Sequence, residues 1–331
     1  MKLITSGKPN YGIVQEPYSE INYLDFDYRD PMGKKLGMLK KKLNYNHFQY
    51  FGVISERLIF GCALVKVKIG ATLFCYVYDT QSKELTEWNF KDVGLFGTDI
   101  VNTPTSGVSS FKRGSKTIRF VNQENPREKR LVVDFPDELN IDVSFSETEP
   151  VFEPMCITTK TGTNGWVYAQ KVAGVRCHGE IQCSQGHFDM DTLNAYAHHD
   201  WSGGYMRRET FWNWACLSSE VNGKRLGLNV SCGVNETSYT ENCYWVDGKL
   251  KKIDFVSFDF DRDNPDSEWS ITSNDGQIDL RFKPEGRHEE IQNLLLIKSN
   301  FKQIFGRFNG RIGETPIENK YGFVEDQYVK W

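Results

Sequence analysis

The sequence predicts an all-β protein of antiparallel strands with very little helix. Short segments alternate apolar and polar residues with a period of two, the pattern of a strand that buries one face. Residues 141–145 (IDVSF) and 278–282 (IDLRF) are clear examples. Helical periodicity is scarce by comparison. Many strands with little helix favour a sandwich or a closed barrel.

Tight-turn dipeptides separate the alternating segments. Asn-Gly and Asp-Gly pairs tolerate positive φ and suit two-residue hairpins. They stand at residues 164–165, 222–223, 247–248, 275–276 and 309–310. Some of these pairs fit longer loops equally well. As a set they predict a meander of antiparallel strands.

The best helical candidate is the short segment 31–43, which carries the chain's one basic run. Its five lysines are expected to form a solvated helix face. They are Lys34, Lys35, Lys40, Lys41 and Lys42.

The composition describes a globular protein of 331 residues, with 39% hydrophobic and 25% charged residues. Its net charge of -4 argues against a nucleic-acid partner, which usually needs a basic face. The N-terminus lacks the apolar core of a signal peptide, and no run approaches the ~18 apolar residues of a membrane span. We therefore expect a cytoplasmic protein without an integral membrane segment, whose eight cysteines are reduced and buried.

The densest chemistry lies in residues 198–214, which combine two histidines, an aspartate, two arginines and three tryptophans. A carboxylate held against indole rings loses hydration and tends to keep its proton. Burial of Asp200 beside Trp201 would make it an acid, whereas a nearby arginine would keep it ionised. The alternative is a loop carboxylate that caps backbone N–H groups around Gly203 and Gly204.

His198 and Asp200 share one face if this segment is a strand, and His199 points the opposite way. The pair is a candidate proton relay or the beginning of a metal site. A metal needs a third ligand, but the Cys and His residues between 177 and 187 fit no familiar zinc spacing. We therefore expect no metal and no cofactor.

Large side chains in the same region are candidates for the wall of a ligand cavity. Trp212 and Trp214, with Thr210, would line one strand face, which fits core packing as well as a cavity. Arg207 and Arg208 would bind a carboxylate or phosphate head group, or pair internally with an acid. The predicted catalytic residues are Asp200, His198 and Glu241, and the predicted ligand-binding residues are Trp201, Tyr205, Arg207, Arg208, Trp212 and Trp214.

Other enzyme classes are disfavoured. The chain has no Gly-rich phosphate loop, no nucleophile elbow and no dinucleotide fingerprint, which argues against nucleotide-driven chemistry and serine hydrolysis. Glu241 and Glu325 are further acids. Two carboxylates about 5–10 Å apart would permit glycosidase chemistry, a distance that the sequence does not supply.

Several separated motifs occur in a fixed order in the C-terminal half. They are DWSGGYMRRETFWNWA (200–215), RLGLN (225–229), TEN (240–242), VDGKLKKI (246–253), FDRDNPDSEW (260–269), FGRFNGRI (305–312) and GFVEDQYVKW (322–331). Together they resemble a bacterial family of unknown function, DUF2804. The likeness is good over roughly residues 150–331, and in the N-terminal half it extends only to the general strand order.

The resemblance implies two lipocalin-like (calycin-type) antiparallel β-barrels, which we place at residues 1–205 and 206–331. It also implies distant kinship with carotenoid hydratases of the hydroxyneurosporene synthase type and with tocopherol-cyclase-like proteins. In those relatives an acid in an aromatic cavity protonates an isoprenoid double bond, and that acid would map to Asp200. This chain departs from the family in its tail, where Glu325-Asp326-Gln327 replaces the common Glu-Asp-His or Glu-Glu-His.

These features predict a cofactor-independent lyase or isomerase, hydratase- or cyclase-like, acting on a hydrophobic small molecule, lipid or isoprenoid. Asp200 would be the acid and His198 its partner. The indole walls would stabilise a carbocation by ~0.5–2 kcal/mol per ring. One alternative is a non-catalytic carrier, which needs only the walls. Another is a carbohydrate-binding β protein, which would expose Trp212 or Trp214 on an open surface.

Overall fold

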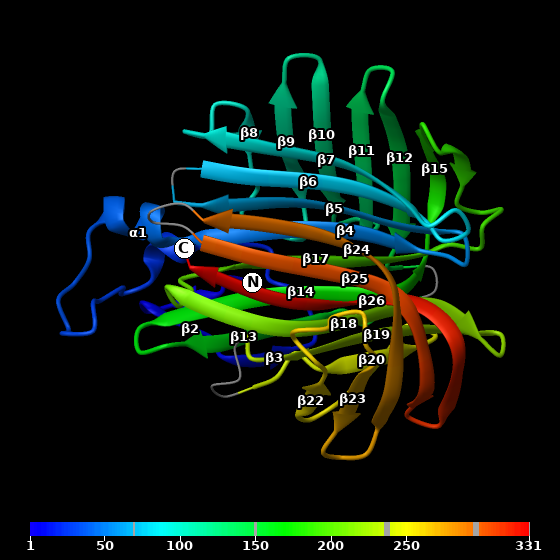
Figure 1. The fold of residues 1–331 in the computed structure, drawn as a ribbon. Coiled ribbons are helices and arrows are strands. Elements are labelled where there is room, and N and C mark those ends of the chain that lie inside the picture. Colours follow the sequence, from blue (N-terminus) through cyan, green and yellow to red (C-terminus); the bar gives the residue numbers. More distant parts are fainter. Residues whose placement is uncertain (69, 149–150, 235–238, 294–297, 331) are drawn as a thin grey trace.

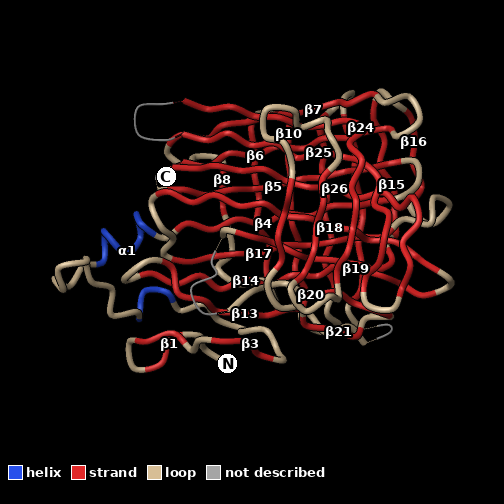
Figure 2. The backbone as a smooth tube through the Cα atoms, turned by 60° about the horizontal axis from the view of Figure 1, so that its bottom comes forward, coloured by secondary structure: helices blue, strands red, loops and turns tan. Residues whose placement is uncertain are grey.

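The computed structural model describes residues 1–331 except 69, 149–150, 235–238, 294–297 and 331. Strands make up most of the described chain, and helix is confined to one end of the molecule (Figure 1, Figure 2). That helical part consists of a 3-10 turn, η1 (Tyr23–Asp25), and one short α-helix, α1 (Met38–Asn44). The predicted all-β class with very little helix is therefore confirmed.

The described strands form three large antiparallel sheets and one small one. In spatial order, the central sheet contains β3 (Gly12–Val14), β13 (Met155–Thr161), β14 (Gly165–Arg176), β17 (Tyr196–Gly204), β4 (Asn46–Ile54), β5 (Leu58–Val67), β6 (Gly70–Asp79) and β7 (Glu84–Val93). The first outer sheet contains β16 (Gly186–Asp189), β15 (His178–Cys183), β12 (Leu139–Ser146), β11 (Glu128–Phe135), β10 (Lys116–Gln123), β9 (Gly107–Arg113) and β8 (Thr98–Asp99). The second outer sheet contains β21 (Lys249–Lys252), β20 (Cys243–Val246), β19 (Lys224–Cys232), β18 (Glu209–Val221), β26 (Thr315–Lys330), β25 (Lys298–Ile312), β24 (Ile278–Asn293), β23 (Trp269–Ser273) and β22 (Val256–Asp259). The small sheet pairs β1 (Ile4–Thr5) with β2 (Lys8–Pro9).

The central sheet packs against both outer sheets, one on each face. On one face, the Phe51 ring lies 5.4 Å from that of Phe145 in the first outer sheet. On the other face, the Tyr76 ring lies 5.0 Å from that of Phe305 in the second outer sheet. Strands covered on both faces read as nearly continuous apolar runs instead of alternating ones. This explains β5, whose sequence LIFGCALVKV is almost wholly buried.

A close backbone contact joins the central sheet to the second outer sheet. Gly174 interrupts β14 as a bulge with φ of 78°, and its N–H donates to Ser218 Oγ on β18 at 3.0 Å. Beside it, a Cβ atom added at Gly227 on β19 would lie 2.1 Å from the carbonyl oxygen of Ala173. Only glycine lets the two backbones approach this closely.

The turn dipeptides have mixed outcomes. The pairs at 222–223 and 247–248 form the predicted two-residue hairpins, with positive φ at all four residues. Asn164 ends a three-residue loop and Gly165 begins β14, whereas the pair at 275–276 lies in the four-residue loop between β23 and β24. The prediction of a turn at 309–310 is wrong, because this pair lies inside β25, where the pairing with β26 shifts register.

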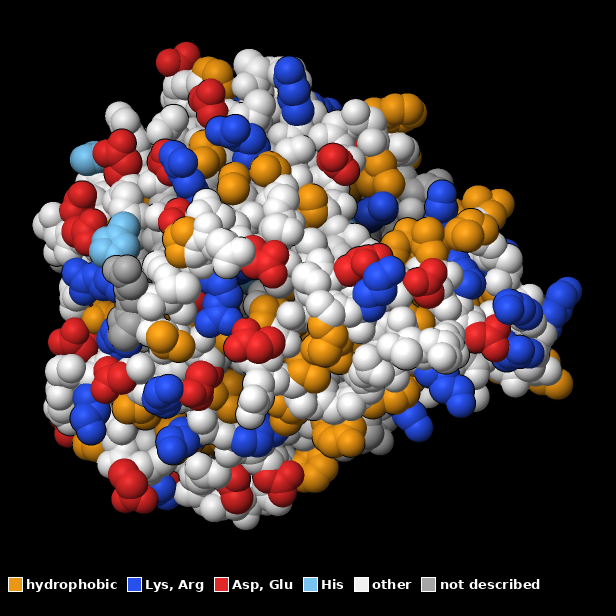
Figure 3. Space-filling view, turned by 180° about the vertical axis from the view of Figure 1, so that it is seen from behind, with side chains coloured by type: hydrophobic (Ala, Val, Ile, Leu, Met, Phe, Trp, Pro, Cys, Tyr) orange, Lys and Arg blue, Asp and Glu red, His pale blue; other side chains and the backbone are white. Residues whose placement is uncertain are grey.

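The predicted helix at 31–43 is shorter than expected, because α1 begins only at Met38. Pro31, Gly33 and Gly37 disfavour helix in the preceding segment. Lys41 is buried and donates to the carbonyl oxygen of Leu24 at 2.6 Å, so the expectation of a fully solvated lysine face is wrong for this residue. Seen from behind, the projecting end that carries α1 is densely covered with Lys and Arg side chains (Figure 3).

Two sequence expectations concern the large-scale organisation. The chain leaves the central sheet at Gly204 and enters the second outer sheet at Glu209, close to the boundary we placed after residue 205. A division into two domains, and into two lipocalin-like barrels, stays a prediction.

Among the described residues, no helix has the length and apolar character needed to cross a membrane. All eight cysteines are free, and six of them are buried.

The contact between Gly227 and Ala173 gives the first testable prediction. Gly227→Ala should destabilise the protein by about 1–3 kcal/mol, because the backbone of β14 must move to admit the methyl group. Gly37→Ala is the control, since a Cβ there meets nothing within 4 Å. Urea unfolding with unchanged m-value measures the difference. Equal midpoints for the two variants would contradict the close approach.

Candidate functional site

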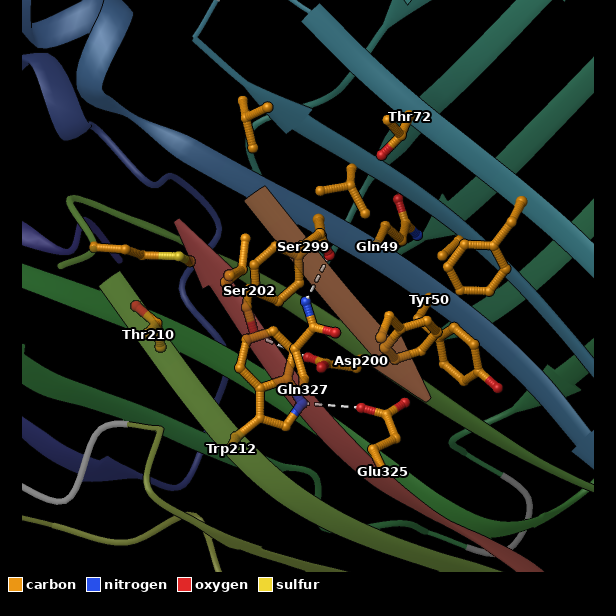
Figure 4. Close-up of a pocket in the computed structure, with 18 of the residues that line it drawn as sticks. Gln49, Tyr50, Thr72, Asp200, Ser202, Thr210, Trp212, Ser299, Glu325 and Gln327 are labelled. Atoms are coloured by element: carbon orange, nitrogen blue, oxygen red, sulfur yellow. Dashed lines mark hydrogen bonds between the residues drawn. The ribbon is translucent and has the colours of Figure 1, made fainter. Parts of the chain in front are cut away.

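A cavity of about 270 Å³ lies between the central sheet and the second outer sheet. It is larger than the ~150 Å³ cavity that accommodates benzene in an apolar core. Strands from both sheets line it, and Asp200, Trp212 and Glu325 lie near one another in its wall (Figure 4). Its outer part is lined mainly by apolar side chains, among them Val67, Val93, Met206 and Val329, with the polar side chains of Asp92, Glu290 and Gln292 beside them. A guest would therefore place a polar or reactive group inward and an apolar body outward.

A buried ammonium group holds two carboxylates at the inner end of the cavity. Lys171 on β14 stands directly opposite Asp200 on β17 in the sheet register. Its Nζ lies 2.6 Å from Asp200 Oδ2 and 3.3 Å from Glu241 Oε1. Ser202 donates to the other Asp200 oxygen at 2.9 Å. The Lys171 ammonium also lies 5.0 Å from the ring centroid of Trp214, a cation–π contact.

The pKa of Lys171 is controlled by two opposing effects. Burial alone would lower this pKa, but attraction to Asp200 and Glu241 outweighs burial and raises it above its ordinary value. Lys171 is therefore positively charged at any physiological pH. Lys171 and Asp200 therefore form a buried ion pair.

Glu325 on β26 is a different kind of acid. It is buried, and burial raises its pKa from 4.5 to about 8, against the opposing effects of a hydrogen bond from Trp212 and the charge of Lys171. Trp212 Nε1 donates to one carboxyl oxygen at 2.9 Å, and Gln303 Nε2 donates to the other at 2.7 Å (Figure 4). Glu325 also lines the cavity. It is thus a carboxylic acid that keeps its proton at neutral pH.

The charges of this cluster explain why one acid stays neutral. The Lys171 ammonium is the positive charge near three carboxyl groups, those of Asp200, Glu241 and Glu325. Full ionisation would leave uncompensated negative charge in a buried site, which is costly. Among the described residues, Lys171 forms ion pairs with Asp200 and Glu241 but none with Glu325. The proton therefore resides on Glu325.

The two histidines of the predicted site point in opposite directions. The His198 ring faces Tyr50 and Phe323, in space that Gly52 leaves open. Burial lowers the pKa of His198 to about 3, so the ring is neutral. Its two nitrogens have no hydrogen-bond partner in the described part of the chain, so the predicted relay to Asp200 is not formed. His199 faces the first outer sheet, where its ring lies 6.4 Å from that of Phe145, and its Nε2 lies 3.0 Å from Nε2 of Gln49 on the neighbouring strand β4.

Trp201 and Tyr205 lie away from the cavity they were expected to line. Trp201 follows Asp200 on β17, so its side chain takes the opposite face of the sheet, against the rings of His47 and Tyr168. Tyr205 packs on Tyr28 in an aromatic cluster near the N-terminus. The expected wall role is therefore corrected for both residues: they are core packing behind the site.

The remaining predicted wall residues divide into two groups. Trp212 and Trp214 line the cavity from β18, as alternation along a strand predicts. Trp214 is 7% exposed, which does not fit the open tryptophan platform of a carbohydrate-binding surface. Arg207 donates to the carbonyl oxygens of Gly233 and Val234, so it secures a loop. Arg208 is exposed to solvent.

Sequence reasoning missed Lys171 and Gln303 and ranked Glu325 only as a further acid. One usable signal for Lys171 was a lysine inside the long apolar run GWVYAQKVAGVR. The tail departure also falls in the site, because Gln327 lines the cavity and donates to Ser299 Oγ at 3.0 Å (Figure 4). The residue that is commonly histidine in the family thus faces any bound guest.

Among the described residues, no group of three His, Cys, Asp or Glu side chains is placed to hold a metal ion. The histidines considered for a zinc site instead make exposed pairs. His178 lies 2.7 Å from Asp191, and His187 lies 2.8 Å from Glu180.

Fold and site together define an all-β protein with a cavity that is acidic at its inner end and apolar at its outer end. The chain belongs to the family described as "Domain of unknown function (DUF2804)", whose model matches residues 2–331. The family assignment made from the separated motifs is confirmed, and the match extends over the N-terminal half as well. A comparison with curated protein sequences gives no match.

Solved structures with a similar fold include two named proteins. Kievitone hydratase from Nectria haematococca shares 10% sequence identity, with 94% of this chain and 97% of that chain covered and a TM-score of 0.55. CghA with Sch210972 also shares 10% identity, with 99% of this chain and 96% of that chain covered and a TM-score of 0.54. At this identity the likeness shows a common fold.

Removing the buried ammonium tests the charge cluster. Lys171→Met leaves Asp200 and Glu241 without their counter-charge and should cost about 3–5 kcal/mol of stability at neutral pH. Adding Asp200→Asn should recover part of that loss. Lys249→Met, which breaks an exposed pair with Glu153, should cost less than about 1 kcal/mol. Similar costs for the buried and exposed pairs in urea unfolding would refute this account.

The raised pKa of Glu325 predicts a pH dependence of stability. Its pKa is about 8 in the folded protein and 4.5 without the fold, so the folded state binds the proton more tightly. The contribution of Glu325 to stability is therefore complete below pH 4.5 and is lost as the pH rises through about 8, by up to about 1.4 kcal/mol per pH unit.

Glu325→Gln removes this titration and supplies the test. The difference in unfolding free energy between wild type and variant should shift in favour of the variant as the pH rises from about 5 to about 8. Taking the difference cancels other groups, including His198, whose lowered pKa acts with the opposite sign. A difference that stays constant with pH would show that Glu325 titrates normally.

Proposed function

We propose that this protein is a cofactor-independent lyase or isomerase, hydratase- or cyclase-like, acting on a hydrophobic small molecule, lipid or isoprenoid. The observation that carries the proposal is Glu325, a neutral carboxylic acid that lines a cavity whose wall also contains large apolar side chains. Similarity to kievitone hydratase, 10% identical, supports the reaction class only through a shared fold.

Glu325 takes the acid role that the sequence assigned to Asp200. In this proposal it donates its proton to a carbon of a double bond, which leaves a carbocation on the neighbouring carbon. Water adds to that carbon in a hydratase, whereas a second double bond of the same guest attacks it in a cyclase. Loss of a proton then completes either reaction. An acid with a pKa near the working pH suits such a transfer.

The ion-paired carboxylates would stabilise the positive charge that protonation creates. Asp200 and Glu241 are fixed around Lys171 and need not reorganise during the reaction, which is the basis of electrostatic catalysis. Trp212 and Trp214 add indole faces at the same end of the cavity. His198, being neutral and buried behind Tyr50, supports the wall in this proposal.

Deuterium transfer tests the proton donor directly. A lipid extract of the source cells is incubated in D₂O with the protein, and products are analysed by mass spectrometry for new carbon-bound deuterium. Glu325→Gln should slow this incorporation by ~10²–10⁴-fold, because the amide has no acidic proton to donate. In the wild type, the rate should fall as the pH rises through about 8, where Glu325 loses its proton.

Glu290→Gln is the matched control, since Glu290 lines the outer part of the cavity and should leave the rate unchanged. Native mass spectrometry of both variants monitors any retained ligand. Unchanged deuteration in Glu325→Gln would remove Glu325 as the acid. A wild-type protein that retains a lipid without deuterating it would be a carrier.

A further inference from the structure

The segment 31–44 combines exposed apolar side chains with lysines. It contains five lysines and no acidic residue, in a chain whose net charge is -4. Four of these lysines are exposed, and the fifth, Lys41, is buried. Between them, Met32, Met38 and Leu39 are 91%, 55% and 71% exposed. Three large apolar side chains held in water so close together need a partner surface.

This segment lies at the outer end of the cavity. Helix α1 leads directly into β4, whose Phe48 lines the cavity four residues after the helix ends. The start of β4 lies beside the end of β5 and the start of β6, because the sheet register pairs His47 of β4 with Lys66 of β5. Figure 1 shows α1 projecting from the end where β24 finishes and β25 begins.

Further exposed apolar residues stand around the same end. Val93, which lines the cavity, is 77% exposed, and nearby Phe96 is 94% exposed. Ile291, between two cavity-lining residues of β24, is 66% exposed. In the view from behind, apolar side chains lie beside the basic projection (Figure 3). Basic and apolar side chains therefore lie together at this end of the cavity, with the acids Asp92 and Glu290 in the cavity wall.

We propose that this end of the molecule docks on an anionic membrane surface, with segment 31–44 and the Val93, Phe96 and Ile291 side chains as the contact. Lysines beside a membrane are attracted to anionic headgroups, and apolar side chains enter the acyl boundary. The docked cavity would open toward the lipid phase. This inference rests on the proposed function to the extent that a hydrophobic guest gives the docking its use.

A lipid surface fits these observations better than an acidic protein. The apolar side chains project singly: Met32 and Phe96 from loops, Met38 and Leu39 from the short helix α1, and Val93 and Ile291 from the ends of β7 and β24. Isolated side chains gain their burial by entering a fluid boundary, whereas a protein partner needs a complementary shape.

Vesicle flotation tests the proposal. Wild-type protein is mixed with vesicles of phosphatidylcholine alone or with added phosphatidylglycerol, at about 0.05 M and about 0.5 M salt. It should float with the anionic vesicles and much less with the neutral ones, and high salt should weaken the binding. Combined replacement of Lys34, Lys40 and Lys42 by Glu should lower the partition coefficient at least ~10-fold.

A charge-matched variant is the control. Combined replacement of the exposed lysines Lys224, Lys251 and Lys283 by Glu changes the net charge equally but lies in other parts of the fold. It should lose severalfold less binding than the first variant. Leu39→Ser should weaken binding at both salt concentrations, because it removes an apolar contact.

Several outcomes would overturn the docking proposal. These are equal loss in the two triple variants, equal flotation on neutral vesicles, and no flotation at all. Binding to polyglutamate without binding to vesicles would point to an acidic protein partner instead. Glu325→Gln should float like the wild type, so failure of docking and failure of the catalytic proposal are separately visible.

Discussion

The site depends on one interaction, the buried ion pair between Lys171 and Asp200 across β14 and β17. Carboxylates in contact offset the cost of burying an ammonium, and Lys171 contacts two of them. Because both are engaged, the third carboxyl group, Glu325, has no equivalent partner and keeps its proton. The charge state of the cavity thus follows from how one cation is shared. As a result, Glu325 would be the proton donor, and Asp200 and Glu241 would be the carboxylates that stabilise a cation.

The central sheet makes this arrangement possible because one of its faces lines the cavity and the other packs against the core. Along β17, Asp200 and Ser202 face the cavity, whereas His199 and Trp201 face the packing behind it. A shift of one residue in the register would exchange these sets. Gly174 lies three residues beyond Lys171 on β14. Its close contact brings the second outer sheet against β14 and so supports this register.

The polarity of the cavity links the proposed chemistry to the proposed docking. Its charged end is buried between two sheets, and its apolar end opens beside α1, where lysines and exposed apolar side chains surround the opening. A guest that prefers lipid to water would enter from that side without crossing water. Gln327 lines the path between the two ends and bonds to Ser299. Because the Gln327 side chain is a neutral amide, Glu325 is the cavity-lining residue of β26 that can titrate.

The sequence by itself determined the all-β class, the hairpins at 222–223 and 247–248, the family, and Trp212 and Trp214 as neighbours on one face. Strand alternation and turn chemistry are local properties that a few neighbouring residues carry, and the motifs keep their order along the chain. Only the tertiary structure decided the acid. Lys171 and Asp200 are separated by two intervening strands, and Glu325 comes from a different sheet. A pKa depends on burial and on charges in space, which no local pattern contains.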